Sequence, residues 1–153
     1  SKLFCLVGLG GLQVGRGTIK FGFEYNPLTA DAKRFARNES LLEDFPHLMV
    51  GLPTARWLRE SLCAIRRCLD PDHLASIRIP TLILAPMRDG VIPYIDQENL
   101  SRHFRAAQLI PVPGARHELF QEKDVHRVQA LAAIAAFIPG SDAEKAEVAL
   151  TME

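Results

Sequence analysis

Two side chains stand out as candidates for acid–base chemistry, Asp89 and His117, because each follows a short, mostly apolar run that ends at a proline. Asp89 comes after residues 81–85, and His117 comes after residues 108–112. Runs of this length suit buried parallel strands, and reactive side chains gather in the loops at the carboxyl ends of such strands. An aspartate bonded to one imidazole nitrogen leaves the other nitrogen as a base. We therefore expect the two side chains to touch and to form two of the three members of a nucleophilic triad. The sequence supports equally the alternative that Asp89 is a surface aspartate in a turn and His117 an ordinary loop histidine.

The elements that must hold these two side chains lie in the second part of the chain, residues 71–140. Its apolar runs and helical spacings alternate as in a right-handed parallel α/β unit. The expected elements are a strand over 81–85, a helix from Pro93, a strand over 108–112 and a helix over 124–138. Two strands alone do not make a covered parallel sheet, so this part looks like the edge of a larger one. A polar tail, residues 141–153, follows.

The first part of the chain, residues 1–70, is predicted to consist of helices joined by irregular turns. The clearest helix covers 54–69, where apolar residues recur at helical spacing and arginines occupy the other faces. A shorter helix is expected over 29–37, with Thr29 as its cap. Residues 20–25 alternate weakly, which favours a short extended piece.

The composition excludes several classes of protein. The 153 residues are 48% hydrophobic and 24% charged, with 18 basic and 18 acidic side chains, as in a soluble globular chain of one domain. The zero net charge gives no long-range attraction to nucleic acid or to an anionic membrane. The apolar stretch 3–14 is too short to span a bilayer, which needs about 20 residues. Three cysteines without paired spacing indicate small buried side chains and a reducing, cytoplasmic compartment.

Other features of the sequence favour a structural role over a catalytic or ligand-binding role. The glycine-rich segment 10–18 lacks the lysine of a phosphate-binding loop, and no strand precedes it. Residues 117–121 begin like a zinc-protease helix but end in glutamine, which removes the second ligand. The other histidines, at positions 47, 73, 103 and 126, share no ligand-like spacing. Trp57 is most simply a core residue of its helix.

The residues around both candidates resemble a known family. Residues 79–85, followed by Asp-Gly-Val-Ile-Pro at 89–93, are similar to the seventh strand and acid loop of the α/β-hydrolases. The string Gly-Ala-Arg-His-Glu at 114–118, with Glu122 and Asp124, resembles the histidine loop of bacterial lysophospholipases. That group is related to the monoacylglycerol lipases and serine aminopeptidases. The resemblance covers residues 1–138 and includes segments similar to the group's helical cap: Asn26-Pro27-Leu28-Thr29, Asp31, Arg34, and Gly51-Leu52-Pro53-Thr54 with Trp57-Leu58.

The resemblance implies an α/β fold, the C-terminal part of an α/β-hydrolase, with a helical cap over 1–70 and the last two parallel strands and their helices after it. It also implies hydrolysis of carboxylic esters of lipid-like substrates through an acyl-enzyme. In that mechanism His117 acts as general base and then general acid, and Asp89 orients it. Trp57 in the cap would bind the substrate by covering its acyl chain. No metal or organic cofactor is implied, and peripheral membrane contact suits such substrates.

The serine that this family uses for attack has no counterpart in the chain. The family places it in a Gly-x-Ser-x-Gly turn, and none of the serines at 1, 40, 61, 76, 101 and 141 lies in one. The family's order is serine, acid, histidine, so the nucleophile is expected before residue 1, in a missing N-terminal half. We expect no hydrolysis by this chain alone, and self-association through an uncovered sheet edge. The alternatives are a non-catalytic interaction module that docks on a partner, and a haloperoxidase- or thioesterase-like hydrolase.

Overall fold

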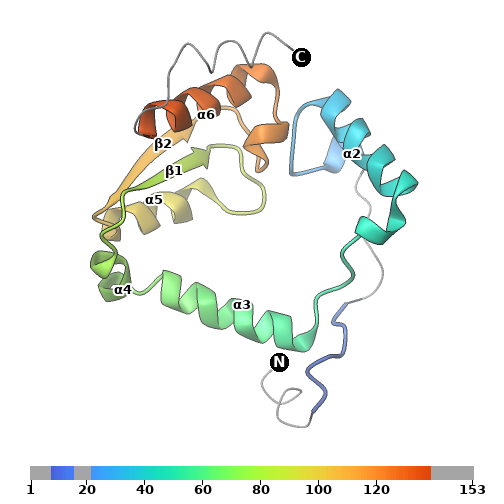
Figure 1. Cartoon of the computed structure of the whole chain (residues 1–153), viewed down its shortest axis with the longest axis horizontal. Helices are drawn as coiled ribbons and strands as arrows, with labels where there is room; N and C mark the ends of the chain where they lie inside the picture. Colours follow the sequence, from blue (N-terminus) through green and yellow to red (C-terminus); the bar gives the residue numbers. More distant parts are fainter. Residues whose placement is uncertain (1–7, 16–21, 139–153) are drawn as a thin grey trace.

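The computed structural model describes residues 8–15 and 22–138, which form a small parallel α/β unit and a set of helices (Figure 1). The elements of the described residues are, in chain order, η1 (Phe23–Tyr25), α2 (Ala32–Asp44), η2 (Pro46–Leu48), α3 (Ala55–Cys68), α4 (Pro71–Ser76), β1 (Thr81–Pro86), α5 (Tyr94–His103), β2 (Ala107–Val112), η3 (Leu119–Gln121) and α6 (Asp124–Phe137). The order β1, α5, β2, α6 confirms the α/β class expected from the sequence.

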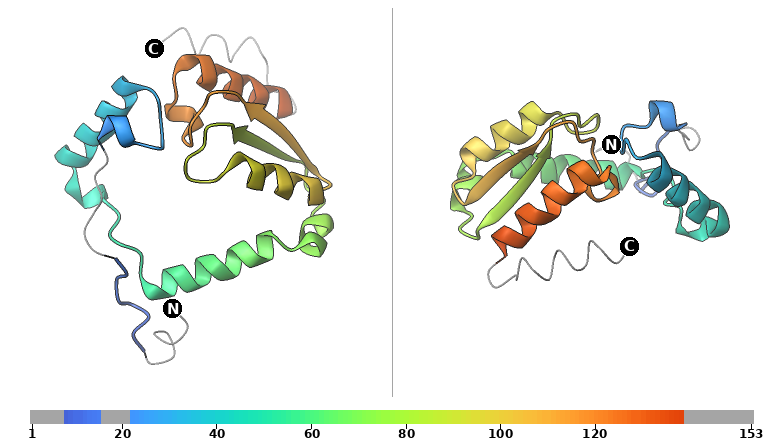
Figure 2. Two further views of the ribbon diagram at one scale, coloured as in Figure 1. Left: turned by 180° about the vertical axis from the view of Figure 1, so that it is seen from behind. Right: turned by 90° about the horizontal axis from the view of Figure 1, so that it is seen from above.

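The two strands form a parallel sheet whose register sets the site. Thr81 pairs with Ala107 and Pro86 pairs with Val112, so β1 and β2 end at the same edge. The strands lie between α5 and α6 (Figure 2). Within the described residues β1 pairs with β2 alone, as expected for one side of a wider parallel sheet.

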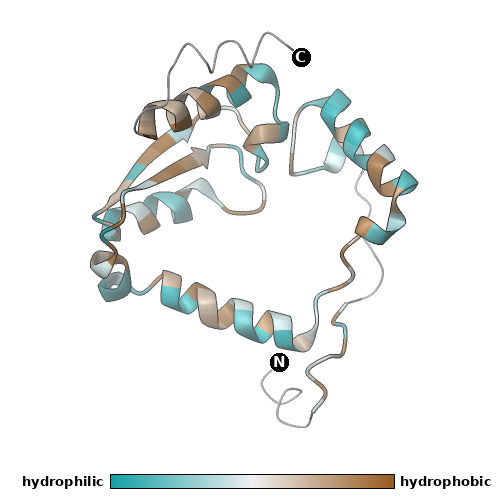
Figure 3. Ribbon diagram, viewed as in Figure 1, coloured by the Kyte–Doolittle hydropathy of each residue, from teal (hydrophilic) through white to brown (hydrophobic). Residues whose placement is uncertain are grey.

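The hydrophobic core joins β2, the loop after it and α6. Val112, Ala115, Leu119 and Ala130 are buried together, and the partly buried Leu84 of β1 packs against them. The apolar residues are concentrated on the two strands and α6 (Figure 3). Burying one Val or Leu side chain contributes about 1.5–3 kcal/mol. This cluster therefore fixes the start of the loop that carries the candidate histidine.

The helix predicted over 54–69 is α3, and Thr54 caps it as expected. The Thr54 hydroxyl accepts a hydrogen bond from the Trp57 backbone N–H at 3.1 Å. The apolar stripe of α3 is about half exposed at Leu62, Ile65 and Leu69. Trp57 is 59% exposed, so its interpretation as a core residue is wrong. None of the helices among the described residues has the length and apolarity to span a membrane.

The shorter predicted helix begins later than its sequence suggests. It is α2, and its cap is Asp31, whose carboxylate accepts from the Arg34 N–H at 3.0 Å. Thr29 does not cap it. Its hydroxyl accepts from the N–H of Asp31 at 3.0 Å, before the helix begins, and donates to the carbonyl of Gln121 at 2.6 Å. These two bonds hold Thr29 in the turn that precedes α2, and the helix is capped by Asp31 instead.

Three smaller expectations also need correction. Phe23–Tyr25 is a 3-10 turn rather than an extended piece, and residues 20 and 21 lie outside the described part. Asp70 does not merely end α3 but caps α4 through the N–H groups of residues 72 and 73. Cys63 and Cys68 are exposed rather than buried, like the other residues of α3 from 62 to 68. Cys5 lies outside those residues.

Candidate active site

The two candidate side chains lie on neighbouring loops that follow the paired strand ends. Asp89 comes three residues after β1, and His117 comes five residues after β2. Backbone hydrogen bonds continue beyond the strands and tie the two loops together. The N–H of Met87 donates to the carbonyl of Val112 at 3.1 Å, and the N–H of Arg88 donates to that of Ala115 at 2.9 Å. Both loops therefore open at the same edge of the sheet.

The carboxylate of Asp89 and the imidazole of His117 are in direct contact. The distance between Asp89 Oδ2 and His117 Nδ1 is 2.9 Å. The Asp89 side chain is 2% exposed, whereas that of His117 is 31% exposed. The contact expected from the sequence is confirmed, and the roles of these residues in catalysis stay a prediction. A buried carboxylate behind a partly open imidazole is the arrangement that leaves the second ring nitrogen accessible.

The loop after β1 holds one oxygen of the Asp89 carboxylate, and His117 and α5 contact the other. Its Oδ1 accepts from the N–H groups of Val91 and Ile92 at 2.7 and 2.9 Å. Its Oδ2, which contacts His117, lies 3.4 Å from the amide nitrogen of Gln97 on α5. The Gln97 amide also donates to the Ile92 carbonyl at 3.0 Å, so α5 is fastened to the loop that carries Asp89.

These contacts favour the charged form of Asp89. Burial of the Asp89 carboxyl raises its pKa, but the hydrogen bond with His117 and the bonds from the Ile92 and Val91 N–H groups lower it by more. The pKa of Asp89 therefore lies below the ordinary value of 3.8. An ionised carboxylate accepts only, so Nδ1 of His117 carries the proton in this hydrogen bond, and in the neutral ring Nε2 is then the acceptor.

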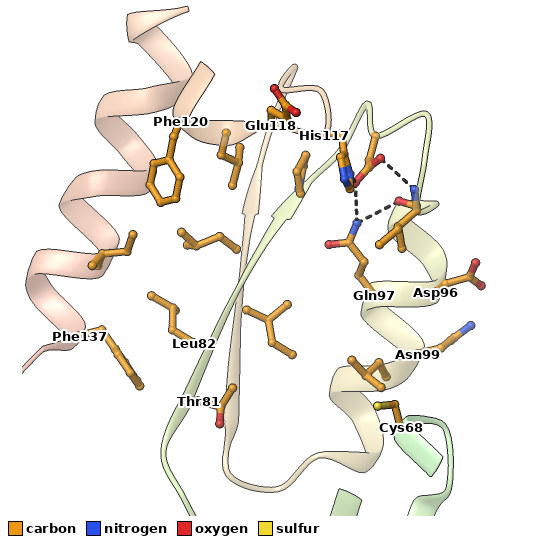
Figure 4. A pocket seen from close by; sticks show the side chains of 18 of the residues that line it. Cys68, Thr81, Leu82, Asp96, Gln97, Asn99, His117, Glu118, Phe120 and Phe137 are labelled. Carbon is orange, nitrogen blue, oxygen red and sulfur yellow. Dashed lines mark hydrogen bonds and ion pairs between the residues drawn. The ribbon is translucent and has the colours of Figure 1, made fainter. Parts of the chain in front are cut away.

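A large cavity lies beside this pair. It has a volume of about 1740 Å³ and is bounded by β1, the end of α3, α5 and the end of α6. His117 and Gln97 lie at one end of it, and Leu82 and Phe137 line its apolar part (Figure 4). A cavity with a long apolar wall and polar groups at one end suits a ligand with an apolar chain.

The structure does not bring Trp57 to this cavity. Trp57 lies near the start of α3, whereas the residues of α3 that line the cavity come from its last turns, Ala64 to Cys68. Its role in substrate binding therefore remains a prediction.

Two further residues near the pair, Gln97 and Glu122, were not predicted from the sequence as site residues. Gln97 lies one turn into the helix that Pro93 opens, and only the rotation of α5 directs it to Asp89. Glu122 belongs to the string that resembles the histidine loop, but no role was assigned to it. It is fully buried, and its Oε1 accepts from the Arg116 N–H at 2.9 Å, next to His117.

The two segments that partly match a zinc-binding helix and a phosphate-binding loop adopt other structures where they are described. Residues 117–121 form a loop and the 3-10 turn η3 rather than a zinc-binding helix. No group of three His, Cys, Asp or Glu side chains could hold a metal ion within the part of the chain that is described. In the glycine-rich segment, Gln13 forms an isolated bridge with Thr54, so this loop packs on the start of α3; residues 16–18 lie outside the described part.

The described serine hydroxyls contribute nothing to the pair. Ser40, Ser76 and Ser101 each donate to a carbonyl three residues earlier in the same helix. No hydrogen bond joins a described serine to the ring of His117, in agreement with the absence of a Gly-x-Ser-x-Gly turn from the sequence.

Comparison with known proteins assigns the arrangement to a family. The sequence profile of the family described as serine aminopeptidase, S33, matches residues 21–124, more than half of the chain. The chain belongs to this family of α/β-hydrolases. The match includes Asp89 and His117, together with both strands of the sheet.

Two bacterial lysophospholipases are among the similar proteins. The probable lysophospholipase L2 of Haemophilus influenzae is 31% identical over 138 residues, which are 89% of this chain and 44% of that protein. The lysophospholipase L2 of Escherichia coli strain K12 is 30% identical over 135 residues, 83% of this chain and 39% of that protein. The chain thus spans about two fifths of the length of these curated relatives.

Proposed function

We propose that this chain is the C-terminal portion of a lysophospholipase-like serine hydrolase that cleaves carboxylic esters of lipid-like substrates. The observation that carries the proposal is the 2.9 Å contact between Asp89 and His117 at the ends of two paired parallel strands. Membership of the serine aminopeptidase family and the similarity to two lysophospholipases support the reaction class.

The chemistry of the pair is that of a general base. As a serine hydroxyl attacks the ester carbonyl, Nε2 of His117 takes its proton, and Asp89 stabilises the imidazolium that forms. The same proton then passes to the leaving alcohol, and the acyl group stays on the serine. In the second half of the reaction His117 takes a proton from water, which attacks the acyl-enzyme, releases the acid and restores the serine.

We propose that the serine comes from sequence outside this chain. Since the relatives are more than twice as long as the matched region, they have ample sequence to supply it. The same additional sequence would pair with the free edge of β1 and fill part of the cavity. The rest of the cavity, with its apolar wall of Leu82 and Phe137, would receive the acyl chain, and Trp57 would add to its cover.

Reconstitution tests this proposal. The full chain is mixed with the polypeptide encoded in frame upstream of it, and hydrolysis of a lysophospholipid and of a short-chain ester is followed. The mixture should hydrolyse both, the chain alone should hydrolyse neither, and His117→Ala should abolish turnover. His103→Ala, an exposed histidine at the end of α5, is the matched control and should leave turnover unchanged.

Two results would contradict the proposal. Turnover by the purified chain alone that is lost in His117→Ala would show that the nucleophile is within the chain. Full activity of a reconstituted His117→Ala protein would show that His117 is not the base.

A non-catalytic interaction module is the second candidate, favoured by the edge of β1 that no described residue pairs with and by the apolar cavity beside it. Exposed strand edges are templates for pairing with another chain. This candidate predicts binding of the upstream polypeptide or another partner without turnover, so the same mixing experiment separates the two functions.

A further inference from the structure

The buried polar residues of the described chain gather in one place, beside His117. Besides the Asp89 side chain, three polar or charged residues are buried within the described ranges: Asn26 is 3% exposed, Thr29 is 1% exposed and Glu122 is fully buried. A buried carboxylate is costly unless hydrogen bonds satisfy it. Such an arrangement persists only where its partners are well placed, so the bonds of Glu122 indicate what it holds.

The Glu122 carboxylate joins three backbone segments. Its Oε1 accepts from the N–H of Ala30 at 3.0 Å and from the N–H of Arg116 at 2.9 Å. Its Oε2 accepts from the N–H of Lys123 at 3.0 Å, at the start of α6. Because Arg116 directly precedes His117, the carboxylate fixes the backbone from which the imidazole projects.

The turn at residues 26–29 supplies the other half of this arrangement. The Asn26 side chain closes the turn by accepting from the N–H groups of Leu28 and Thr29 at 2.8 and 3.1 Å. The Arg116 guanidinium donates to the carbonyls of Asn26 and Thr29 at 2.8 and 3.0 Å. The Thr29 hydroxyl reaches the carbonyl of Gln121. The turn is therefore bonded to the chain on both sides of His117.

The same turn also packs against the loop that carries Asp89. A Cβ atom added to Gly90 would lie 3.2 Å from the Cβ of Pro27, tighter than ordinary van der Waals contact. Beyond His117, the N–H of Glu118 donates to the carbonyl of Leu28 at 2.8 Å. Residues 26–29 thus contact both loops of the Asp89–His117 pair.

We propose that Asn26, Thr29, Arg116 and Glu122 form a polar clamp that holds the imidazole of His117 against the carboxylate of Asp89. Glu122 is the principal positioning residue of the clamp, because one carboxylate binds the turn, the residue before His117 and the start of α6. The catalytic consequence of the clamp rests on the proposed function; its effect on the geometry of the pair does not.

The first test is Glu122→Gln in the full chain, with Glu43→Gln on the exposed surface of α2 as the matched control. Glutamine keeps the size of the side chain but replaces one of the two oxygens by an NH₂ group, a donor that faces a backbone N–H donor in either orientation of the amide. Two nuclear magnetic resonance signals report on the pair: the downfield proton of His117 Nδ1, and the titration of the Asp89 carboxyl carbon.

Glu122→Gln should broaden or remove the His117 proton signal and raise the titration midpoint of Asp89 by roughly 0.5–1 pH unit, because a carboxylate that loses a close donor titrates higher. Glu43→Gln should change neither signal. A loss of stability alone, with both signals unchanged in the folded protein, would mean that Glu122 is structural and not a positioning residue.

The second test keeps the proposal open to refutation if Glu122→Gln does not fold. Thr29→Val removes the hydroxyl that bonds to Gln121 while keeping the shape of the side chain, and Thr29→Ser restores the hydroxyl. The midpoint of Asp89 should rise in Thr29→Val and return in Thr29→Ser. An unchanged midpoint in Thr29→Val, or the same rise in both variants, would overturn the proposal.

The reconstituted hydrolase separates failure of the clamp from failure of the proposed function. There, Glu122→Gln should lower kcat at least tenfold with little change in KM, because the clamp acts on the base and not on the ligand. If reconstituted His117→Ala is active, the proposed function fails, whereas the resonance measurements on the clamp still stand.

Discussion

At the scale of single residues, the two oxygens of Asp89 have different partners. Oδ1 is occupied by the N–H groups of Val91 and Ile92, and this leaves Oδ2 to accept from His117. The carboxylate therefore organises its own turn and the imidazole together. A side chain with a single acceptor oxygen cannot make both sets of hydrogen bonds, so it cannot replace the carboxylate.

Asp89→Asn tests this division of partners. The asparagine oxygen is needed by the N–H groups of residues 91 and 92, so its NH₂ group should face Nδ1 of His117. That contact forces Nδ1 to accept and moves the proton to Nε2, where it blocks general base catalysis. Nitrogen-15 spectra of the histidine should show the changed tautomer, and kcat of the reconstituted hydrolase should fall about 10⁴-fold. An unchanged tautomer would contradict this prediction.

The lowered pKa of Asp89 predicts a pH dependence of stability. A carboxyl whose pKa is lower in the folded than in the unfolded chain stabilises the fold above its unfolded value, and this contribution disappears as the pH falls through its folded value. The difference in the free energy of unfolding between the parent chain and Asp89→Ala should therefore decrease as the pH falls below about pH 4. Urea unfolding at several pH values measures it, and a difference that grows towards low pH would be contrary to expectation.

The nearness of Asp89 and His117 could be predicted from the sequence because it follows from the topology of the sheet. Two parallel strands that end at one edge bring their following loops together whatever the side chains between them are. The positions of Gln97 and Glu122 could not be predicted in this way. Gln97 depends on the rotation of α5, and Glu122 depends on the folding of residues 26–31 against the histidine loop.

At the scale of elements, the turn that leads from β2 to His117 depends on a glycine with a constrained environment. Gly114 has a φ of +80°, and a Cβ atom added there would lie 2.9 Å from Cε1 of His126. His126 projects from α6, and its Nδ1 is buried without a hydrogen-bond partner among the described residues. The turn and the helix are thus packed together with no room for a side chain.

Gly114→Ala should therefore destabilise the fold by about 1–3 kcal/mol, because a left-handed backbone and a close contact both oppose the new methyl group. Gly22→Ala is the matched control, since Gly22 has a φ of −63° and open space around its Cα. It should change the free energy of unfolding by only a few tenths of a kcal/mol or stabilise slightly. Equal effects of the two substitutions in denaturant unfolding would contradict the packing argument.

The boundaries of elements were predicted well where local capping decides them and poorly where distant residues do. Thr54 caps α3 as the sequence indicates, because no other group uses its hydroxyl. Thr29 has the same local signal, but its hydroxyl accepts from the Asp31 N–H and donates to Gln121, and Asp31 caps α2 instead. Sequence patterns do not show that Gln121 lies next to Thr29 in the fold, so the change of cap from Thr29 to Asp31 could not be predicted from them.

At the scale of the whole molecule, the described residues leave a broad apolar surface uncovered. The stripe of α3, the edge of β1 and the end of α6 all border the same cavity. An apolar surface next to an unpaired strand edge favours association with another chain.

The full chain should therefore self-associate as its concentration rises, unless the upstream polypeptide is present. Leu82→Lys, which places a charge on the cavity wall, should weaken self-association at least tenfold in sedimentation experiments. Val125→Lys, at an exposed position of α6 that does not line the cavity, is the control and should have little effect. Equal effects of the two lysines would indicate that net charge, rather than this surface, controls association.

The polar clamp has a consequence for the order of events when the protein is made. Its bonds from residues 26–30 to residues 116–122 join positions 87 to 92 apart in the chain. Closing a loop of that length costs roughly 4 kcal/mol in chain entropy, which local helices do not have to overcome. We expect α2, α3 and α5 to form early during synthesis and the clamp to close last. A nascent chain would then lack an assembled base until nearly all of the family-matched region has left the ribosome.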